Sequence, residues 1–367
     1  MGLVLSSPVQ FLHADSSQRY VIGWGSDQAG QATGIPSVRF TNGAFVKTDN
    51  RSATGAVMIA SQVLSNAAVV SAGFGHSLAI RSDGTVVGWG GNGLGETLGY
   101  ETPYLYPTNG VAKISGQILS NVVSVVAART FSLALKNDGT VVTWGENYIP
   151  AGLTNIVAIA AEWGCSWALK RDGTVVGWAS QSSSNGYGQL ISVDNLSNVV
   201  AIAVGPGGNN TRGVALKSDG TVAHWGLESI YKDATPPVGL SNVVAIAAGD
   251  GHTLALKSDG TVIGWGANNV GQATGVLTTN FPDNSEAGQV KIGGQILSGV
   301  IAISANRGYS MALKKDGTVI LWGQRRVSDL YPATVPVGLS GVVAISAGEN
   351  FCLAITTNRA VAEKFRH

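Results

Sequence analysis

The chain has 367 residues and a formal net charge of +1. Charged residues make up 12% of it, against about 25% in an average domain, and no run of Lys or Arg exceeds two residues, so nothing would neutralise a row of phosphates. No apolar stretch reaches the roughly 18 to 20 residues of a membrane-spanning helix. Composition therefore argues against nucleic acid and against a membrane as partners.

Three short apolar segments recur throughout the chain, and the clearest copy runs from Asn242 to Gly266. Each segment has the length and composition of a β-strand. The first recurs near Val69, Val122, Ile156, Val199, Val243, Ile301 and Val343, and the second near Leu78, Leu133, Trp167, Val214, Leu254, Met311 and Leu353. The third ends in Trp24, Trp89, Trp144, Trp178, Trp225, Trp265 and Trp322. These copies predict one all-β domain over residues 1–367, a seven-bladed β-propeller.

The N-terminal strand stands apart because its tryptophan precedes the first complete copy. We expect Tyr20 to Gly25 to complete the blade formed by residues 342–355 and so to close the ring, which removes exposed strand edges. Residues 360–365 would then occupy the position of that blade's own third strand. We expect this segment either to fray outward or to compete for the edge.

Three long linkers share a motif of the type V-x-K-I-x-G-Q-I-L, at residues 56–64, 111–119 and 290–297. We expect them to form extended outer strands. The first segments contain small residues, as in Ala245 to Gly249, which suits a crowded inner strand. The tryptophans of the third segments suit the space between blades, where each would bury a large apolar surface.

The turn between the first and second segments differs from copy to copy, whereas the strands around it stay nearly the same. Its residues are aromatic, cationic, anionic or polar, and one copy is four residues longer. In a blade of antiparallel strands this turn lies on the same face as the loop after Trp-Gly, which also varies. Diversity on one face of a rigid scaffold is typical of a binding surface. We therefore predict partner binding by Phe74, Arg129, Thr130, Trp163, Asn209, Asn210, Asp250, Arg307, Glu349 and Asn350. Drift in solvent-exposed turns is the alternative explanation.

Asp-Gly pairs join the second segment to the third at Asp83, Asp138, Asp172, Asp219, Asp259 and Asp316. Asp-Gly between strands predicts a tight hairpin in which both residues have positive φ. We interpret these aspartates as turn formers and not as catalytic or calcium-binding groups, because they recur in every copy without nearby partner ligands.

The segment Trp265 to Gln272, with echoes at Trp24 to Gln31 and Trp89 to Gly95, resembles the W-G-x-N-x-x-G-Q signature of regulator of chromosome condensation repeats. Linkers 237–242 and 336–341 look more like the bacterial branch of this family, which includes a secreted β-lactamase inhibitory protein. The resemblance implies a seven-bladed propeller that contacts proteins through loops on one face, as an exchange factor, a chromatin docker or an inhibitor. It also favours a bacterial protein that is secreted or at the cell surface over a cytoplasmic one.

We predict that the chain is a monomeric, non-enzymatic scaffold that binds another protein, as an inhibitor or adaptor. The alternatives are binding of a glycan or other cell-surface polymer, a role like that of a guanine nucleotide exchange factor, and an enzyme with its active site at the channel mouth. No exchange wedge and no β-lactamase-binding set can be aligned on this chain.

No residue pattern indicates catalysis, a metal site or a cofactor. His76 and His252 occupy one repeat position that Phe131, Tyr309 and Phe351 fill in other copies, so we expect them to fill space and not to bind metal. Cys165 and Cys352 fall in copies that would stand far apart in a ring, which argues against a disulfide.

Overall fold

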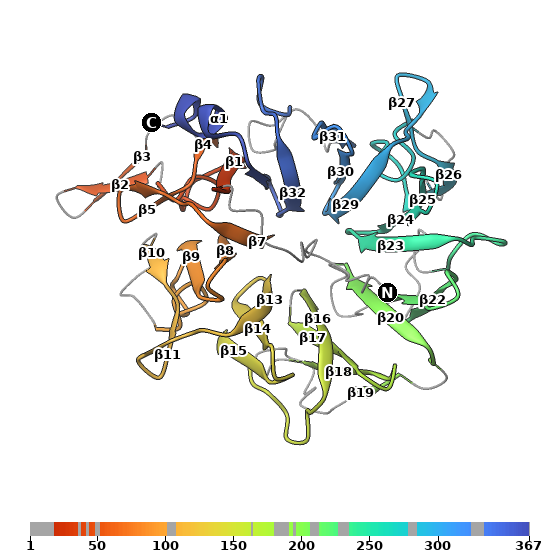
Figure 1. The fold of residues 1–367 in the computed structure, drawn as a ribbon, viewed down its shortest axis with the longest axis horizontal. Helices are drawn as coiled ribbons and strands as arrows, with labels where there is room; N and C mark the ends of the chain where they lie inside the picture. Colours follow the sequence, from red (N-terminus) through yellow and green to blue (C-terminus); the bar gives the residue numbers. More distant parts are fainter. Residues whose placement is uncertain are drawn as a thin grey trace.

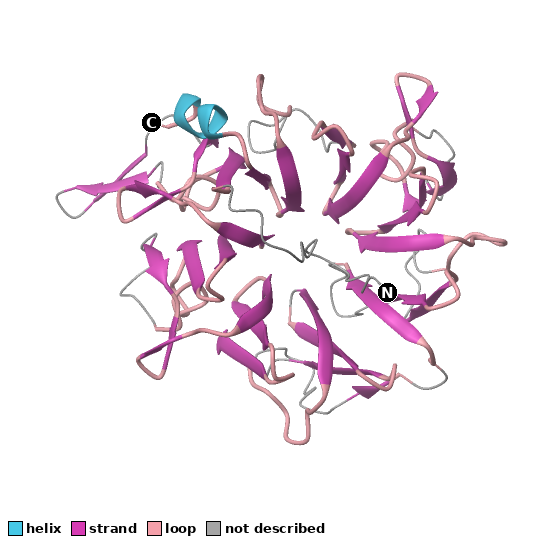
Figure 2. Cartoon of the chain, viewed as in Figure 1, coloured by secondary structure: helices cyan, strands magenta, loops and turns pink. Residues whose placement is uncertain are grey.

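The computed structural model describes residues 18–35, 38–41, 44–47, 52–100, 108–162, 164–179, 191–193, 196–205, 213–226, 235–277, 285–323 and 334–366. These residues form many small antiparallel sheets and one short helix, α1 (Arg359–Lys364), which confirms the all-β class. Figure 2 shows strands throughout the molecule and the helix at its periphery. No helix in these residues is long and apolar enough to cross a membrane.

Seven sheets of three or four strands make up most of the described chain, and we name each by its innermost strand. Four of these sheets have four strands. The β32 sheet contains β32 (Val342–Ala347), β33 (Phe351–Thr356), β1 (Tyr20–Ser26) and β4 (Ser52–Ala56), and the β7 sheet contains β7 (Ala67–Ala72), β8 (His76–Arg81), β9 (Val86–Gly90) and β10 (Thr108–Val111). The β16 sheet contains β16 (Ile156–Glu162), β17 (Cys165–Lys170), β18 (Val175–Ala179) and β19 (Ile191–Ser192), and the β23 sheet contains β23 (Val243–Ala248), β24 (His252–Lys257), β25 (Val262–Ala267) and β26 (Ser285–Gln289).

The other three sheets have three strands each in the described residues. They are the β13 sheet with β13 (Val122–Ala127), β14 (Phe131–Lys136) and β15 (Val141–Gly145), the β20 sheet with β20 (Val199–Val204), β21 (Gly213–Lys217) and β22 (Val222–Trp225), and the β29 sheet with β29 (Val300–Asn306), β30 (Tyr309–Lys314) and β31 (Val319–Trp322). Figure 1 shows the seven innermost strands arranged around a common centre, which is the arrangement of a β-propeller.

The N-terminal strand β1 lies in the sheet that the C-terminal strands begin. It pairs antiparallel with β33 from Tyr20 opposite Thr356 to Gly25 opposite Phe351, and β4 lies on its other side. This is the strand pairing predicted for Tyr20 to Gly25. Both ends of the described chain are therefore held by one sheet.

The expectation for residues 360–365 was wrong, because this segment neither frays nor pairs as a strand but forms α1. The Asn358 side chain accepts a hydrogen bond from the Ala360 amide (3.1 Å) and so caps the helix. Val361 and Ala362 are buried against the β32 sheet. Since β1 already fills the third-strand position, the C-terminal residues cover the end of this sheet instead.

The long linkers also differ from the expectation of extended outer strands. The outer strands β4, β10 and β26 lie before the shared motif or overlap only its first residue. The motif itself folds into two-stranded hairpins, β5 (Met58–Ile59) with β6 (Gln62–Val63), β11 (Lys113–Ile114) with β12 (Gln117–Ile118), and β27 (Lys291–Ile292) with β28 (Gln295–Ile296). A fourth such pair, β2 (Val38–Thr41) with β3 (Ala44–Lys47), lies between β1 and β4.

The Asp-Gly turns are tight hairpin turns, but only their glycines have positive φ. In the first of them φ is 78° at Gly84, whose amide donates to the Arg81 carbonyl (2.9 Å), while the Arg81 amide donates to the Thr85 carbonyl (2.8 Å). This is a three-residue loop with a left-handed glycine, in which Asp83 keeps negative φ. The Asp83 carboxylate accepts from the Thr85 amide and hydroxyl, which lowers its pKa.

Each Asp-Gly turn also packs against the start of the next innermost strand. The Gly84 carbonyl accepts from the Val122 amide (3.1 Å), and the Gly260 carbonyl accepts from the Val300 amide (3.0 Å). We call the end of the molecule that carries these turns the Asp-Gly face. Its turns are uniform in sequence because they join neighbouring sheets.

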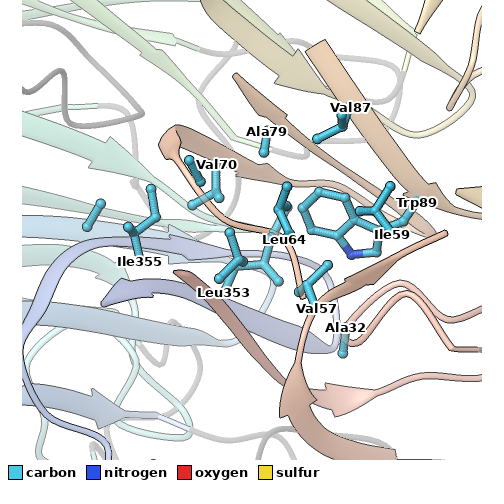
Figure 3. Packing of buried hydrophobic residues seen from close by; sticks show 14 of the residues in the cluster. Ala32, Val57, Ile59, Leu64, Val70, Ala79, Val87, Trp89, Leu353 and Ile355 are labelled. Atoms are coloured by element: carbon cyan, nitrogen blue, oxygen red, sulfur yellow. The ribbon is translucent and has the colours of Figure 1, made fainter. Parts of the chain in front are cut away.

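Apolar side chains from neighbouring sheets meet between them, and the repeat tryptophans are buried there. In the cluster of Figure 3, Trp89 of the β7 sheet packs with Ala32 and Val57 near β1, and Leu353 of β33 belongs to the same cluster. Trp89 is fully buried. The tryptophans therefore act as wedges between sheets, as expected from the sequence.

Candidate functional site

The variable turns lie at the end of the sheets opposite the Asp-Gly face, and we call this end the tip face and its turns the tip turns. Each tip turn joins the first strand of a sheet to the second. The loop after Trp-Gly reaches the same end, since the Glu146 amide donates to the Thr130 carbonyl (3.0 Å) and the Ser26 amide donates to the Asn350 carbonyl (2.8 Å). The two kinds of variable segment therefore meet on one face.

Phe74 and Arg129 lie in neighbouring tip turns and contact each other. The Arg129 guanidinium carbon stands 4.9 Å from the centre of the Phe74 ring, within the range of a cation–π interaction. The Phe74 side chain remains 39% exposed. The Phe74 amide also donates to the Ala128 carbonyl (3.4 Å), so backbone and side chains both join these turns.

Arg307 and Glu349 form an ion pair between the tip turns of the β29 and β32 sheets. Glu349 is buried, whereas the Arg307 side chain is partly exposed. The Asn306 side chain positions this pair, because it accepts from the Arg307 amide (2.7 Å) and donates to the Ala347 carbonyl (3.2 Å). The carboxylate is thus neutralised within the protein.

The two contacts belong to one continuous row. The Glu349 amide donates to the Gly73 carbonyl (3.0 Å), which connects the Arg307–Glu349 pair to the turn that carries Phe74. We call Arg307, Glu349, Phe74 and Arg129 the tip row. It crosses four consecutive sheets, β29, β32, β7 and β13, and presents the partly exposed Phe74 ring beside the Arg129 guanidinium.

Only some of the remaining predicted site residues lie in the described part of the chain. Thr130 and Asn350 contribute the carbonyls that hold the loops after Trp-Gly, and Asp250 is exposed in the tip turn of the β23 sheet. Trp163, Asn209 and Asn210 lie outside the described residues. The structure therefore brings together four of the predicted residues as the tip row.

Glu162 is a residue of this face that sequence reasoning missed. It ends the innermost strand β16, where burial, together with the negative charge of Asp250, raises the pKa of its carboxyl to about 8. A signal was present in the sequence, because the equivalent residues are Gly73, Ala128, Gly249 and Gly348 in four other copies.

His76 and His252 connect neighbouring sheets and are more than space-filling. The Ser132 hydroxyl donates to the Glu96 carbonyl (2.7 Å), so its oxygen accepts a hydrogen bond from the His76 Nε2–H group (2.8 Å). His252 and Ser310 lie at the equivalent distance of 2.9 Å. Burial lowers the pKa of His76 to about 3, which keeps the imidazole neutral.

Groups that could bind a metal are absent from the described residues, where no set of three or more His, Cys, Asp or Glu side chains converges. Cys165 and Cys352 form no disulfide bond. Burial raises the pKa of the Cys352 thiol, which leaves it protonated and a poor nucleophile.

Comparison with known proteins identifies the repeat. The family profile of the regulator of chromosome condensation (RCC1) repeat matches residues 68–96 and 243–272. No curated protein sequence matches the chain.

Solved structures of similar fold are propellers of the same kind. Prp20p from Saccharomyces cerevisiae is 18% identical, with a TM-score of 0.68 over 95% of this chain and 94% of that one. Human WBSCR16 is 18% identical, with a TM-score of 0.65 over 92% and 98%. Yeast RCC1 (Prp20) in its complex with Kap60 is 17% identical, with a TM-score of 0.65 over 99% and 92%. The chain therefore contains segments that match the regulator of chromosome condensation repeat, and its fold is similar to that of propellers of this type.

Proposed function

We propose that this chain is a protein-binding propeller that holds its partner on the tip face and catalyses no reaction. Similar folds support protein binding, because one of them is described with its binding to Gsp1p and histones and another in complex with Kap60. We also propose that the seven sheets form a closed seven-bladed ring. The pairing of β1 with β33 supports closure, since it unites the two ends of the chain in one sheet.

The observation that carries the proposal is the tip row. Its four side chains differ in chemistry from turn to turn, yet backbone hydrogen bonds and side-chain contacts hold them in a fixed arrangement. A binding surface needs both properties, because diverse side chains give specificity and a rigid frame lowers the entropy lost on binding. Arg and aromatic residues are also enriched among interface residues that contribute most to affinity.

Affinity capture from the source organism tests this function. The full chain should retain a partner that the triple variant Arg129→Ala, Trp163→Ala, Arg307→Ala loses, because the variant removes both guanidinium groups of the tip row and the tryptophan that the sequence predicts for partner binding. A matched triple on the Asp-Gly face, Lys136→Ala, Arg171→Ala, Lys315→Ala, should retain it. Thermal melting of both variants checks that each is folded. Equal capture by the two variants would contradict the proposed face.

A further inference from the structure

Cations gather on the Asp-Gly face, although the whole chain carries a net charge of only +1. In six sheets the second strand ends in a cation that stands two residues before the aspartate of the Asp-Gly turn. These cations are Arg81, Lys136, Lys170, Lys217, Lys257 and Lys314. The six aspartates match them in number, and Lys257 Nζ, for example, stands 3.5 Å from Asp259 Oδ2.

Four further cations on this face have no matching aspartate. Arg171 and Lys315 stand in the Asp-Gly turns, and Lys113 and Lys291 stand in the hairpins β11–β12 and β27–β28. All four residues are exposed, and the sequences of the two hairpins contain no Asp or Glu. The Asp-Gly turns and these hairpins together therefore carry four more positive than negative charges.

Both hairpins begin and end beside an Asp-Gly turn. The Ala112 amide donates to the Val86 carbonyl (2.9 Å), and the Val86 amide donates to the Leu119 carbonyl (3.3 Å), so the two ends of the β11–β12 hairpin hold the first residue of β9. The Val290 amide donates in the same way to the Val262 carbonyl (2.9 Å). Figure 1 shows β11 and β27 at the periphery, on opposite sides of the molecule. The Asp-Gly face therefore extends outward to both hairpins.

Each of these hairpins places an exposed isoleucine beside its lysine. Ile118 lies opposite Lys113, and Ile296 lies opposite Lys291, so the two side chains leave the same side of each hairpin. All four residues are exposed. The other side of the β11–β12 hairpin faces the protein, because Ile114 packs against the cluster between the β7 and β13 sheets. An aliphatic side chain and an ammonium group are thus presented together to solvent.

Two turns of identical sequence, Pro-Val-Gly-Leu, carry the most exposed large apolar side chains among the described residues, Val238 and Val337. Each turn lies shortly before an innermost strand at the Asp-Gly face, since the Val243 amide donates to the Gly220 carbonyl of an Asp-Gly turn (3.0 Å). Such a turn needs positive φ only at its glycine, so its geometry does not require a valine at the exposed corner. Lys364 Nζ donates to the Val337 carbonyl (3.2 Å), which places an ammonium group beside this valine too.

We propose that the Asp-Gly face docks on the surface of an anionic lipid bilayer. The exposed isoleucines and valines enter the boundary between headgroups and acyl chains, while the lysines beside them stay at the level of the phosphates. Composition argues against a membrane partner because it averages over the whole chain, whereas the fold collects cations and aliphatic side chains on one face.

A bilayer fits this face better than a folded protein does. The aliphatic side chains are distributed along the periphery, with the β11 and β27 hairpins on opposite sides, so only an extended surface contacts them together. The unmatched cations favour a surface that carries negative charge. Docking in this way leaves the tip face, at the other end of the sheets, directed away from the lipid.

Cosedimentation of the full chain with lipid vesicles tests the proposal. The chain should bind vesicles of equimolar phosphatidylcholine and phosphatidylglycerol, lose this binding in high salt, and bind phosphatidylcholine alone far more weakly. Val238→Ser with Val337→Ser should weaken binding by about tenfold or more, because less apolar surface enters the lipid. Lys113→Gln with Lys291→Gln should also weaken binding by about tenfold or more at low salt.

The matched control is Phe74→Ser with Leu94→Ser, which removes two exposed apolar side chains at the tip face and should leave vesicle binding unchanged. Thermal melting checks that every variant is folded. Hydrogen exchange should slow in residues 113–118 when vesicles are bound. Since partner capture by the tip face is measured without vesicles, this proposal and the proposed function can fail independently.

The proposal is overturned if the chain does not sediment with the mixed vesicles, if the valine variant binds them as well as the natural chain, or if the tip-face control loses binding equally. It is also overturned if polyglutamate or duplex DNA binds the chain as tightly as the mixed vesicles do and the valine variant binds it unchanged, because an acidic macromolecule would then be the occupant of this face.

Discussion

The two faces of this propeller are built from the same repeat, but their turns contact the neighbouring sheets in different ways. On the Asp-Gly face, one turn recurs with nearly the same sequence, and three of these turns make the same backbone hydrogen bond to the next sheet, as Gly84 does with Val122. On the tip face, neighbouring turns are joined by contacts that differ from pair to pair, a cation–π contact at Phe74 and an ion pair at Glu349.

The difference shows where sequence is free to vary. A backbone joint that needs a left-handed residue admits little besides glycine, so the Asp-Gly turns cannot diversify without loss of stability. Side-chain contacts can be exchanged for others of similar strength. The side chains of the tip face can therefore change while the packing of the sheets stays intact.

Breaking two Asp-Gly joints should have the largest effect. Gly84→Val combined with Gly260→Val should lower the free energy of unfolding by about 4 kcal/mol, because each valine is forced to a φ near 78° and crowds the next sheet. Urea unfolding followed by circular dichroism measures this. The matched tip-face variant Gly75→Ala meets open space and should change stability by less than about 0.5 kcal/mol. Similar losses from both would abolish the contrast between the faces.

The buried imidazole of His76 near the tip face should make the free energy of unfolding depend on pH. The pKa of His76 is about 3 in the folded chain and about 6.5 when unfolded, so the unfolded chain binds the extra proton as pH falls below 6.5. Stability is full above pH 6.5 and should fall by an amount on the order of 2 kcal/mol for His76 by pH 4.5. His76→Phe, the residue of the equivalent position 131, should flatten this dependence in urea titrations at several pH values. An unchanged slope would argue against a buried neutral imidazole.

Ion pairs on the two faces should differ in their contribution. Glu349 is buried, so Glu349→Gln should lower the free energy of unfolding by about 1 kcal/mol, because it weakens the contact with Arg307. On the Asp-Gly face, Lys257 Nζ and Asp259 Oδ2 stand 3.5 Å apart and both side chains are more exposed. Lys257→Met should therefore leave the free energy of unfolding nearly unchanged. Measuring the free energy of unfolding of both variants in low and high salt distinguishes the buried ion pair from the exposed one. A larger effect at Lys257 would reverse the comparison.

The smallest effect should come from the exposed pair in the tip row. A double-mutant cycle with Phe74→Ala and Arg129→Ala should give a coupling energy of about 0.5 kcal/mol, since the cation–π contact is open to solvent. Chemical unfolding of the four proteins measures it. A coupling near zero would mean that these side chains are held in place by the backbone alone.

Much of the fold follows from local sequence. The repeat spacing, the buried tryptophans and the Asp-Gly hairpins are visible in the chain, because strand periodicity and turn formation depend on neighbouring residues. The prediction that both residues of each Asp-Gly turn have positive φ was wrong for the aspartate, since Asp83 keeps negative φ. The expectation for residues 360–365 was also wrong, because β1 from the other end of the chain occupies the strand position that they would have taken.

The glycine that precedes Trp-Gly in some copies shows the limit of sequence reasoning. Gly88 and Gly264 stand where other copies have Thr143 and His224, a difference plain in the sequence. Its meaning depends on the loop that returns over the strand, which approaches so closely that a Cβ at Gly88 would strike Thr97. That loop could not be placed by reading one repeat at a time.

The amino-acid sequence by itself determined the kind of repeat and the order of strands and Asp-Gly turns within each copy. Tertiary structure decided which variable residues touch. Phe74 and Arg129 are 55 residues apart, and Arg307 and Glu349 are 42 apart, yet each pair meets because consecutive sheets bring their tip turns side by side. The physical reason is that strands and turns form from local preferences, whereas contacts between sheets depend on how every sheet packs against the next.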